Sequence, residues 1–501
     1  MTAVLTAAQM VADPTVLMAI FFSSLFGLFV GAVPGLTATM ATALLVPITF
    51  FLPPVAAIGA IVSATAMAIF AGDIPGCLLR MPGTPASAAY VDESYAMTRN
   101  GQAQRALGTS LVFSAIGGVF GTLVLSVSAP ALAEVALQFS SFEYFWLVLL
   151  GLTCAVFIAS DAPLKGVITL MLGLLFGSVG LNNPAAHPRF TFDIPDLLGG
   201  INLIPAMIGL FAISEVLRFA QERGTLPAVK QEIGAVLSGM GGLVHRYKVQ
   251  ALRGSALGTV VGALPGAGAD IAAWMSYAIS KKMSRTPEKF GTGHPEGLAE
   301  AGAANNAALA GAWIPALVFG IPGDSITAIA IGVLYMKNMN PGPTIFVNQP
   351  ENVYAVFMIF LLANLFLIPL GWLCIKVASR LLRVPRNMLM PVILLFCVVG
   401  AFAINNATFD LYVLIGFGLL AWFLEANRFP VAPMILGILL GTMLEEHFIR
   451  SMIKSDGQWL AFVERPIAAG LAVVTFAIWI GSGWMAARGR RPAARVTSQT
   501  L

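Results

Sequence analysis

The sequence predicts an all-α protein that crosses the membrane many times, built from two inverted repeats whose helices are broken or re-entrant at Pro-Gly pairs. Three observations support this fold class. Of the 501 residues, 58% are hydrophobic and only 10% are charged, whereas a soluble domain is about 25% charged. Apolar residues occur in runs long enough to span a bilayer as helices. Pro-Gly pairs recur in the same order in both halves of the chain.

The apolar runs predict roughly 10–14 transmembrane segments, since about 20 residues of helix cross the hydrocarbon core. A β-barrel would instead show segments of about ten residues with alternating hydrophobicity. The runs cover residues 15–32, 54–71, 107–129, 144–160, 163–179, 200–217, 351–375, 388–404, 409–425, 430–444 and 466–486.

The longest hydrophilic stretch divides the chain almost in half. We expect a first transmembrane repeat at 15–217, a hydrophilic central connection at 218–253 and a second repeat at 254–446. A final helix region at 447–487 and a basic tail at 488–501 follow. Because Lys and Arg near helix ends favour the cytoplasm, the connection and the tail are expected there. A simple helix count cannot place every basic cluster in the cytoplasm, so some helices must be broken or re-entrant.

Several classes of function are disfavoured. The net charge of +4 is scattered and gives no reason to expect nucleic-acid binding. No GxxxxGK[ST] motif occurs, so ATP hydrolysis by a P-loop is not expected. The N-terminus lacks the basic start of a cleaved signal peptide, and the first helix is expected to direct membrane insertion. The cysteines are expected to pack as small apolar residues, without disulfides or a metal site: Cys77, Cys154, Cys374 and Cys397.

The Pro-Gly pairs indicate an internal duplication. Aligning GAVPG with GALPG pairs Pro34 with Pro265, and aligning MPGTPASA with IPGDSITA pairs Pro82 with Pro322. Each proline removes a backbone donor and clashes with the preceding turn, and each glycine permits unusual backbone angles. Two matching breaks in the same order, each followed by small and hydroxylated residues, are difficult to explain by chance.

Paired interruptions in corresponding halves point to the binding site of a transporter. Irregular backbone is tolerated in a membrane only against protein or a wet cavity. Helix N-termini suit a carboxylate, and freed oxygens suit Na⁺. The predicted substrate-binding residues are Pro34, Gly35, Thr37, Thr39, Pro82, Gly83, Thr84, Pro265, Gly266, Asn305, Asn306, Pro322, Gly323 and Ser325. The predicted ion-coupling residues are Asp324, Thr327, Asn305 and Ser87, with a Na⁺ site near Asp324 and Asn306.

Charged residues near the breaks have competing interpretations. Asp324 directly follows a break and is expected to ligate a cation or carry a proton. Asp270 is a weaker candidate, because it is expected near an aqueous end. Arg80 either pairs with an anionic substrate or is a helix-end arginine that reaches the membrane surface, and Asp73 is a candidate ion-pair partner for it.

The polar residues also have a purely structural interpretation. Two adjacent amides, Asn305 and Asn306, enter an otherwise apolar helix at a free-energy cost unless they are bonded. They are therefore either ligands or hydrogen bonds between two helices. The threonines and serines after the breaks could likewise serve close helix packing. The four histidines are dispersed and form no metalloprotease motif.

The ordered motifs GAVPG, MPGTPASAA, GQAQRALG, GALPGAGADIAAWMSY, PEKFGTGHPEG, GAANNA and GIPGDSITAI resemble those of the large membrane subunit of the tripartite tricarboxylate transporter family, over about residues 15–445. The resemblance implies a multi-pass secondary transporter of the bacterial inner membrane. It implies uptake of small organic carboxylates (tricarboxylates, dicarboxylates or aromatic acids) with Na⁺ or H⁺ as coupling ion and no other cofactor. The implied partners are a small four-helix membrane subunit and a periplasmic solute-binding protein. An elevator mechanism follows by analogy with other carriers of this kind.

The chain departs from the family pattern at several positions. Asp73 replaces a residue that is often polar and uncharged, and Arg80 stands where Asn is common. Asp270 replaces a small or hydroxylated residue, and Glu300 begins the triplet Glu-Ala-Gly where Ala-Pro-Glu is usual. The resemblance therefore does not identify the substrate.

Other functions make different predictions. The main alternative is an ion-coupled carboxylate carrier that works without a binding protein. A membrane-embedded enzyme would need a nucleophile–base pair or a metal cluster, which the sparse histidines do not suggest. A purely structural scaffold would not explain four polar breaks at membrane depth.

Overall fold

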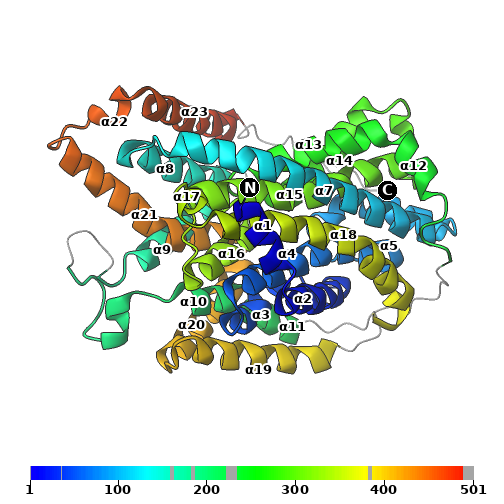
Figure 1. The fold of residues 1–501 in the computed structure, drawn as a ribbon, viewed down its shortest axis with the longest axis horizontal. Helices are drawn as coiled ribbons and strands as arrows, with labels where there is room; N and C mark the ends of the chain where they lie inside the picture. The colour runs from blue at the N-terminus through cyan, green and yellow to red at the C-terminus, as the bar shows by residue number, and fades with distance from the viewer. Residues whose placement is uncertain are drawn as a thin grey trace, which may run out of the picture.

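The chain is an all-helical polytopic membrane protein, seen here in a computed structural model that describes residues 2–34, 36–157, 163–181, 187–221, 234–381 and 386–488. In Figure 1, α19 runs along the lower edge and α23 along the upper edge, with α4 and α15 between them. Within the described ranges, the one β-feature is an isolated bridge between Gly180 and Arg189. The helices are α1 (Thr2–Val11), α2 (Pro14–Ala32), α3 (Ala38–Phe50), α4 (Pro54–Ala71), α5 (Asp73–Leu79), η1 (Ser87–Tyr90), α6 (Val91–Arg99), α7 (Ala103–Ala136), α8 (Ser141–Phe157), α9 (Pro163–Gly177), η2 (Pro195–Gly199), α10 (Leu203–Ile208), η3 (Gly209–Ile213), α11 (Ser214–Gln221), α12 (Met240–Arg246), α13 (Lys248–Gly262), α14 (Gly268–Met283), η4 (Pro287–Lys289), α15 (Pro295–Phe319), α16 (Ser325–Met336), α17 (Ile345–Asn348), α18 (Pro350–Leu381), α19 (Arg386–Asn405), α20 (Phe409–Ala426), α21 (Ala432–Lys454), α22 (Ala461–Glu464) and α23 (Pro466–Arg488).

Seven helices of the described chain are long and apolar enough to cross a membrane. Each coincides with one of the predicted apolar runs. They are Pro14–Ala32, Pro54–Leu79, Ala103–Ala136, Leu203–Ala220, Pro350–Ala378, Phe409–Ala426 and Ala432–Lys454. The other four runs correspond to shorter apolar helices, at Ser141–Val156, Pro163–Gly177, Met390–Asn405 and Pro466–Gly481.

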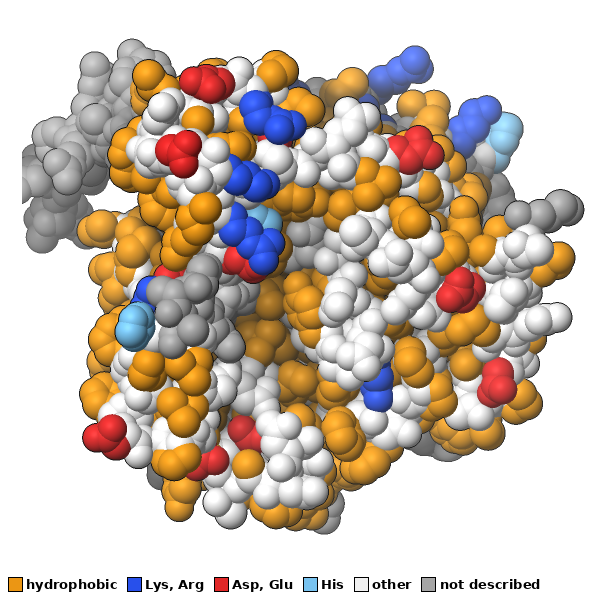
Figure 2. Space-filling view, turned by 60° about the vertical axis from the view of Figure 1, so that its left-hand side comes forward, with side chains coloured by type: hydrophobic (Ala, Val, Ile, Leu, Met, Phe, Trp, Pro, Cys, Tyr) orange, Lys and Arg blue, Asp and Glu red, His pale blue; other side chains and the backbone are white. Residues whose placement is uncertain are grey.

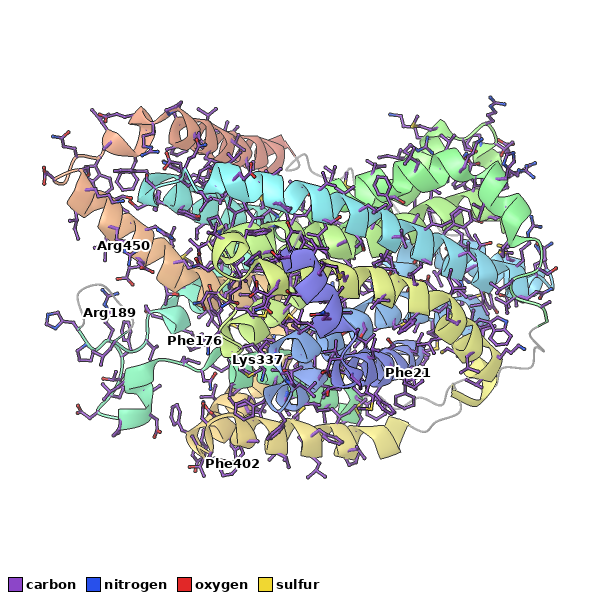
Figure 3. The ribbon with its side chains drawn as sticks, viewed as in Figure 1. Phe21, Phe176, Arg189, Lys337, Phe402 and Arg450 are labelled. Carbon is purple, nitrogen blue, oxygen red and sulfur yellow. The ribbon has the colours of Figure 1, made fainter. Side chains whose placement is uncertain are left out.

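The outer surface is apolar, as a lipid-facing surface requires. Figure 2 shows hydrophobic side chains over much of one face, with charged side chains scattered among them. Phe21 of α2 is 42% exposed and Phe402 of α19 is 39% exposed, both in the lower part of Figure 3. A water-soluble monomer rarely exposes so much contiguous apolar surface, whereas a bilayer solvates it.

Two helices form the interior. All of α4 after Pro54 is buried, and α15 is buried from Pro295 to Val318. Both are rich in Ala and Gly, which lets neighbouring helices approach closely. The second helix, α15, packs between α7 and α13, and α4 packs against α2. The four cysteines are buried and free.

In each half, two glycines one helical turn apart lie directly against carbonyl oxygens of the interior helix. An added Cβ at any of them would come within 2.1–2.4 Å of an alanine oxygen. Corresponding positions of the two halves therefore make the same contact. The pairs are Gly27 with Ala64, Gly31 with Ala68, Gly258 with Ala304 and Gly262 with Ala308.

These contacts predict the effect of a single methyl group. Gly258→Ala would force α13 away from α15, and overpacking of this kind costs about 1–3 kcal/mol. We expect a lower midpoint when the purified protein is heated and its monodisperse fraction is measured by size-exclusion chromatography. The matched control is Gly416→Ala on α20, where an added Cβ meets no atom within 4 Å. Equal midpoints for the two variants would contradict the close approach.

The four Pro-Gly pairs aligned above lie between helices, as predicted. The first pair separates α2 from α3, the second α5 from η1, the third α13 from α14 and the fourth α15 from α16. Gly35 of the first pair lies outside the described residues. The helices before the second and fourth pairs end alike, because Arg80 (φ 58°) and Gly320 (φ 69°) are both left-handed caps.

The predicted central connection is partly helical. Helix α13 begins at Lys248, inside the stretch 218–253, and α12 also lies there. Residues 222–233 of this stretch are outside the described part of the chain, as are residues 489–501 of the predicted basic tail.

Asn405 ends α19, and the following Asn406 has a φ of 51°.

Candidate functional site

The four broken segments meet around one cavity of about 190 Å³. Its wall combines hydroxyls, carboxylates and exposed backbone with a few apolar side chains. The lining residues are Thr37, Ala38, Thr39, Ile69, Thr84, Pro85, Ala86, Ala155, Gly266, Ala267, Gly268, Ala269, Asp270, Ile271, Asn305, Asp324, Ser325, Ile326, Ala432 and Leu436.

Seven of the sixteen predicted site residues that the structure describes line this cavity. Those that do are Thr37, Thr39, Thr84, Gly266, Asn305, Asp324 and Ser325. The described residues that were predicted but do not line it are Pro34, Pro82, Gly83, Ser87, Pro265, Asn306, Pro322, Gly323 and Thr327. Most of this second group shape the loops: Gly83 and Gly323, for example, have no room for a Cβ, because the carbonyl oxygens of Gly31 and Gly262 lie within 3.0 Å of it.

Two reciprocal caps fix the second and fourth loops. Asp324 caps α16: its Oδ1 accepts from the Thr327 backbone N–H at 2.8 Å, and its own N–H donates to Thr327 Oγ1 at 2.9 Å. At the corresponding place in the first half, the Ser87 N–H donates to Thr84 Oγ1 at 3.1 Å and the Thr84 N–H donates to Ser87 Oγ at 3.2 Å. The Asp324 pair is a capping box that satisfies backbone donors at the start of α16, whereas the Thr84 pair closes the turn before η1.

Three helices begin at the cavity: α3, α14 and α16. Thr37 is the N-cap of α3 and accepts from the Met40 N–H at 3.1 Å, and Asp324 is the N-cap of α16. The first residues of all three helices line the cavity wall. Free N–H groups and the helix dipole make such starts favourable for a negatively charged group.

The charge of the cavity comes from one half of the chain. Asp270 and Asp324 both line it, and no Lys, Arg or His is among its lining residues. Asp270 is exposed in the cavity, and its Oδ1 accepts from the Ala86 N–H at 3.0 Å. The corresponding positions in the first half are uncharged, Thr39 and Thr84. Hydroxyls of the first half therefore face carboxylates of the second half.

Asn305 brings the interior helix to the cavity. It is 1% exposed, its Nδ2 donates to Tyr90 Oη at 3.2 Å, and its Oδ1 has no hydrogen-bond partner. Asn306 is also buried, and both polar atoms of its amide lack a partner, but it does not line the cavity. The structure therefore brings Asn305, and not its neighbour, together with Asp324.

The candidate ion pair between Arg80 and Asp73 is not formed. Arg80 instead pairs with Asp92 at 2.8 Å, and both side chains are largely exposed. Asp73 is buried and accepts from the Tyr90 hydroxyl at 2.7 Å. Arg80 has the left-handed backbone conformation that ends α5, so its side chain does not continue along the helix. It points away from the first turn of α5, where Asp73 lies.

Sequence reasoning missed three parts of the site. It treated Asp270 as peripheral, and it did not single out Ala86 or Tyr90. The signal for Asp270 was its alignment with the predicted site residue Thr39. Tyr90 lies close to the second break, but its hydrogen-bond partners, Asp73 and Asn305, come from α5 and α15, which only the folded chain brings together. The apolar wall from α8 and α21, at Ala155 and Leu436, also carries no sequence signal.

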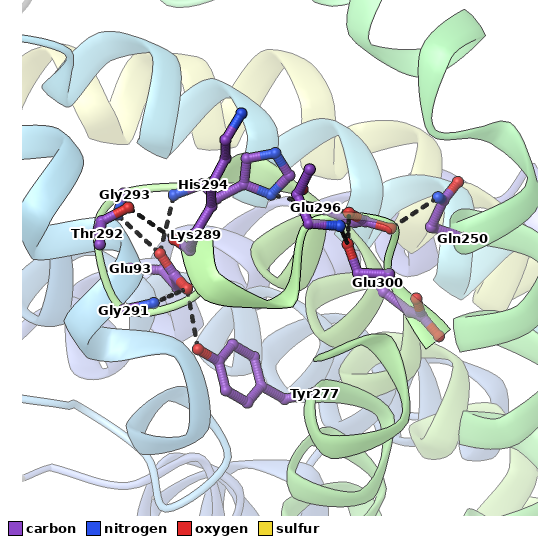
Figure 4. Close-up of polar contacts among 12 residues, drawn as sticks. Glu93, Gln250, Tyr277, Lys289, Gly291, Thr292, Gly293, His294, Glu296 and Glu300 are labelled. Carbon is purple, nitrogen blue, oxygen red and sulfur yellow. Dashed lines mark hydrogen bonds and ion pairs between the residues drawn. The ribbon is translucent and has the colours of Figure 1, made fainter. Parts of the chain in front are cut away.

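A second polar cluster joins the two halves outside the cavity (Figure 4). Glu93 of α6 is fully buried and accepts from four donors of the second half. The Gly293 and His294 N–H groups donate at 2.9 Å each, the Tyr277 hydroxyl also donates at 2.9 Å, and the Gly291 N–H completes the set. The loop 291–294 thus encloses a carboxylate from the other half of the chain.

Comparison with known proteins identifies the family. The profile of the tripartite tricarboxylate transporter TctA family matches residues 17–436. An uncharacterized 52.8 kDa protein in the TAR-I ttuC′ 3′ region of Agrobacterium vitis is 36% identical over 458 residues, 91% of each chain. An uncharacterized protein in the TAR-II ttuC′ 3′ region of the same organism is 38% identical over 214 residues, 43% of this chain and 88% of that protein. No solved structure matches this chain. The full-length relative and the family profile agree with the ordered motifs, and the chain therefore belongs to the tripartite tricarboxylate transporter TctA family.

Proposed function

We propose that this protein takes up small organic carboxylates across the bacterial inner membrane as the large subunit of a three-component secondary transporter. Its partners would be a small four-helix membrane subunit and a periplasmic solute-binding protein that delivers the substrate. Tricarboxylates, dicarboxylates and aromatic acids are the candidate substrates. Membership of the transporter family supports this proposal. The main structural support is the cavity where the four broken segments meet.

The cavity suggests how substrate and ion would share the site. A carboxylate would bind near Thr37 and Thr39, where α3 begins and no acidic side chain is contributed. A cation would bind near Asp324, Asp270 and Asn305 Oδ1, which offer oxygen ligands. Two carboxylates without a basic residue repel an anion, so the substrate would enter only together with Na⁺ or H⁺. This requirement is a physical basis for symport.

The paired contacts of the two halves support a duplicated architecture. The interior helices α4 and α15 receive the same glycine contacts, and the second and fourth loops have the same reciprocal cap. We propose that the two halves are inverted repeats and that the cavity crosses the membrane by an elevator-like movement. In transporters built from such repeats, substrate and ion sites lie at the repeat interface, close to the bilayer midplane.

Uptake assays with and without the soluble component test the proposal. Proteoliposomes would contain this chain with a small four-helix membrane subunit, and the binding protein would be loaded with labelled citrate, tartrate or benzoate. We expect uptake that needs both the binding protein and an imposed Na⁺ or H⁺ gradient. Uptake at full rate without the binding protein would favour the carrier that works alone.

A further inference from the structure

Asp73 is a buried acid within a membrane-spanning helix, and the proposed substrate and ion positions do not use it. It is 3% exposed and lies in the candidate span Pro54–Leu79. Its Oδ1 accepts from the Tyr90 hydroxyl at 2.7 Å, and its Oδ2 accepts from the Ser110 hydroxyl. None of the ion pairs in the described chain includes it. An unpaired charge in such a place is costly, and binding a proton removes it.

The surroundings of Asp73 offer no other charge that would compensate it. The titratable groups that face it are Tyr90 and, on its own helix, Cys77. Helices α2 and α4, which pack against α5, contain no titratable side chain. Helix α7 contributes the uncharged Ser110.

The acidic groups of α6 are already bound elsewhere. Asp92 pairs with Arg80, and Glu93 is enclosed by the loop 291–294. Of the other titratable side chains on α6, Arg99 is exposed and Tyr95 is half-buried. Asp270 lies beyond Tyr90 and faces the cavity. Asp73 is therefore the carboxylate next to Tyr90 that lies outside the cavity lining and has neither an ion pair nor an enclosing loop of its own.

A hydrogen-bonded chain connects Asp73 to the cavity. The Tyr90 hydroxyl donates to Asp73 and accepts from Asn305 Nδ2, and Asn305 lines the cavity. A tyrosine hydroxyl has a single proton to donate. While the Asp73 carboxylate takes that proton, Asn305 must turn its Nδ2 toward Tyr90. Its Oδ1, which has no partner, is then the amide atom left for an occupant of the cavity.

We propose that Asp73 binds the coupling proton and that this proton reverses the hydrogen-bonding polarity of Asn305. One proton from water joins the Asp73 carboxylate, whose new O–H donates to Tyr90. The Tyr90 hydroxyl is then free to donate to Asn305 Oδ1, and rotation of the amide leaves Nδ2 for the cavity. An acceptor suited to a cation thereby becomes a donor suited to a carboxylate. Loss of the proton on the other side of the membrane restores the acceptor and releases the substrate. This inference rests on the proposed carboxylate uptake.

The test measures proton uptake on substrate binding. Purified transporter in weakly buffered solution with a pH-indicator dye would receive citrate, tartrate or benzoate, whichever the binding protein delivers. We expect about one proton per bound carboxylate in the wild type, since linked binding takes up protons when the bound state holds more of them. Asp73→Asn should take up none, and its uptake rate in proteoliposomes should lose its dependence on pH. Asp410→Asn is the matched control, because Asp410 is also buried and bonded to amides but does not line the cavity.

Two outcomes overturn the inference. In the first, Asp73→Asn keeps the proton uptake and the pH profile of the wild type. The second is measured on the wild type and does not depend on how Asp73→Asn folds. In it, infrared difference spectra on substrate addition show no C=O band of a protonated carboxyl group, or show one that Tyr90→Phe leaves unshifted. Failure of the wild type to transport any carboxylate, with all three components present, would instead remove the proposed function together with this inference.

Discussion

Asp324→Asn is expected to reduce ion-driven uptake by roughly tenfold or more, which corresponds to about 1.4 kcal/mol of lost coupling. The substitution removes a cavity carboxylate but retains a good helix cap, because Asn accepts the Thr327 N–H as Asp does. Folded protein in the membrane should therefore stay near its wild-type amount. Initial rates of uptake against the Na⁺ or H⁺ gradient, normalised to monodisperse protein, provide the measurement.

Two further variants separate charge from capping. Asp324→Ala removes both, and the loss of the cap adds about 1 kcal/mol of destabilisation. Ser325→Ala keeps the charge and the cap but removes a hydroxyl from the cavity wall. We expect it to weaken uptake while thermal stability stays unchanged. Wild-type kinetics in both Asp324→Asn and Ser325→Ala would argue against this site.

Glu93→Ala is expected to lower the free energy of unfolding by roughly 3 kcal/mol or more. Hydrogen bonds to a charged group contribute about 1.5–3 kcal/mol each, and the substitution would leave three backbone N–H groups without their acceptor. The expected observation is a lower thermal midpoint and increased proteolysis near the loop 291–294. Substrate should restore little of the stability, since the cluster lies outside the cavity lining.

The control for Glu93 is a charged residue with an exposed partner. Asp92→Ala removes the ion pair with Arg80, in which both side chains are 62% exposed. Exposed pairs of this kind contribute about 0–1 kcal/mol, so this variant should unfold close to the wild type. If the two variants were equally stable, the loop 291–294 would not depend on the enclosed carboxylate.

The sequence predicted the features that depend on local chemistry. Apolar runs of the right length predicted the spans, and the four aligned Pro-Gly pairs predicted where helices end. The segments at those breaks contain six of the seven predicted residues that line the cavity, and the seventh is Asn305 on α15. A broken helix in a membrane has to turn its freed groups inward.

Contacts between distant segments could not be predicted in this way. The choice between Asp73 and Asp92 as the partner of Arg80 depends on the direction in which the helix cap turns the side chain. Glu93 is buried because a glycine-rich loop from the other half folds around it, a contact that its own segment of sequence does not indicate. The two neighbouring amides were indistinguishable, since only the rotation of α15 decides that Asn305 faces the cavity.

The matching caps of the two halves have a consequence for how such a site could diversify. Thr and Asp side chains can both accept a hydrogen bond from the backbone N–H three residues later, and here Thr84 does so in the turn before η1 and Asp324 does so as the N-cap of α16. An exchange between them changes the charge of the cavity by one unit while the loop keeps its shape. A duplicated gene could therefore alter the electrostatics of its transport site by single substitutions, without passing through an unfolded intermediate.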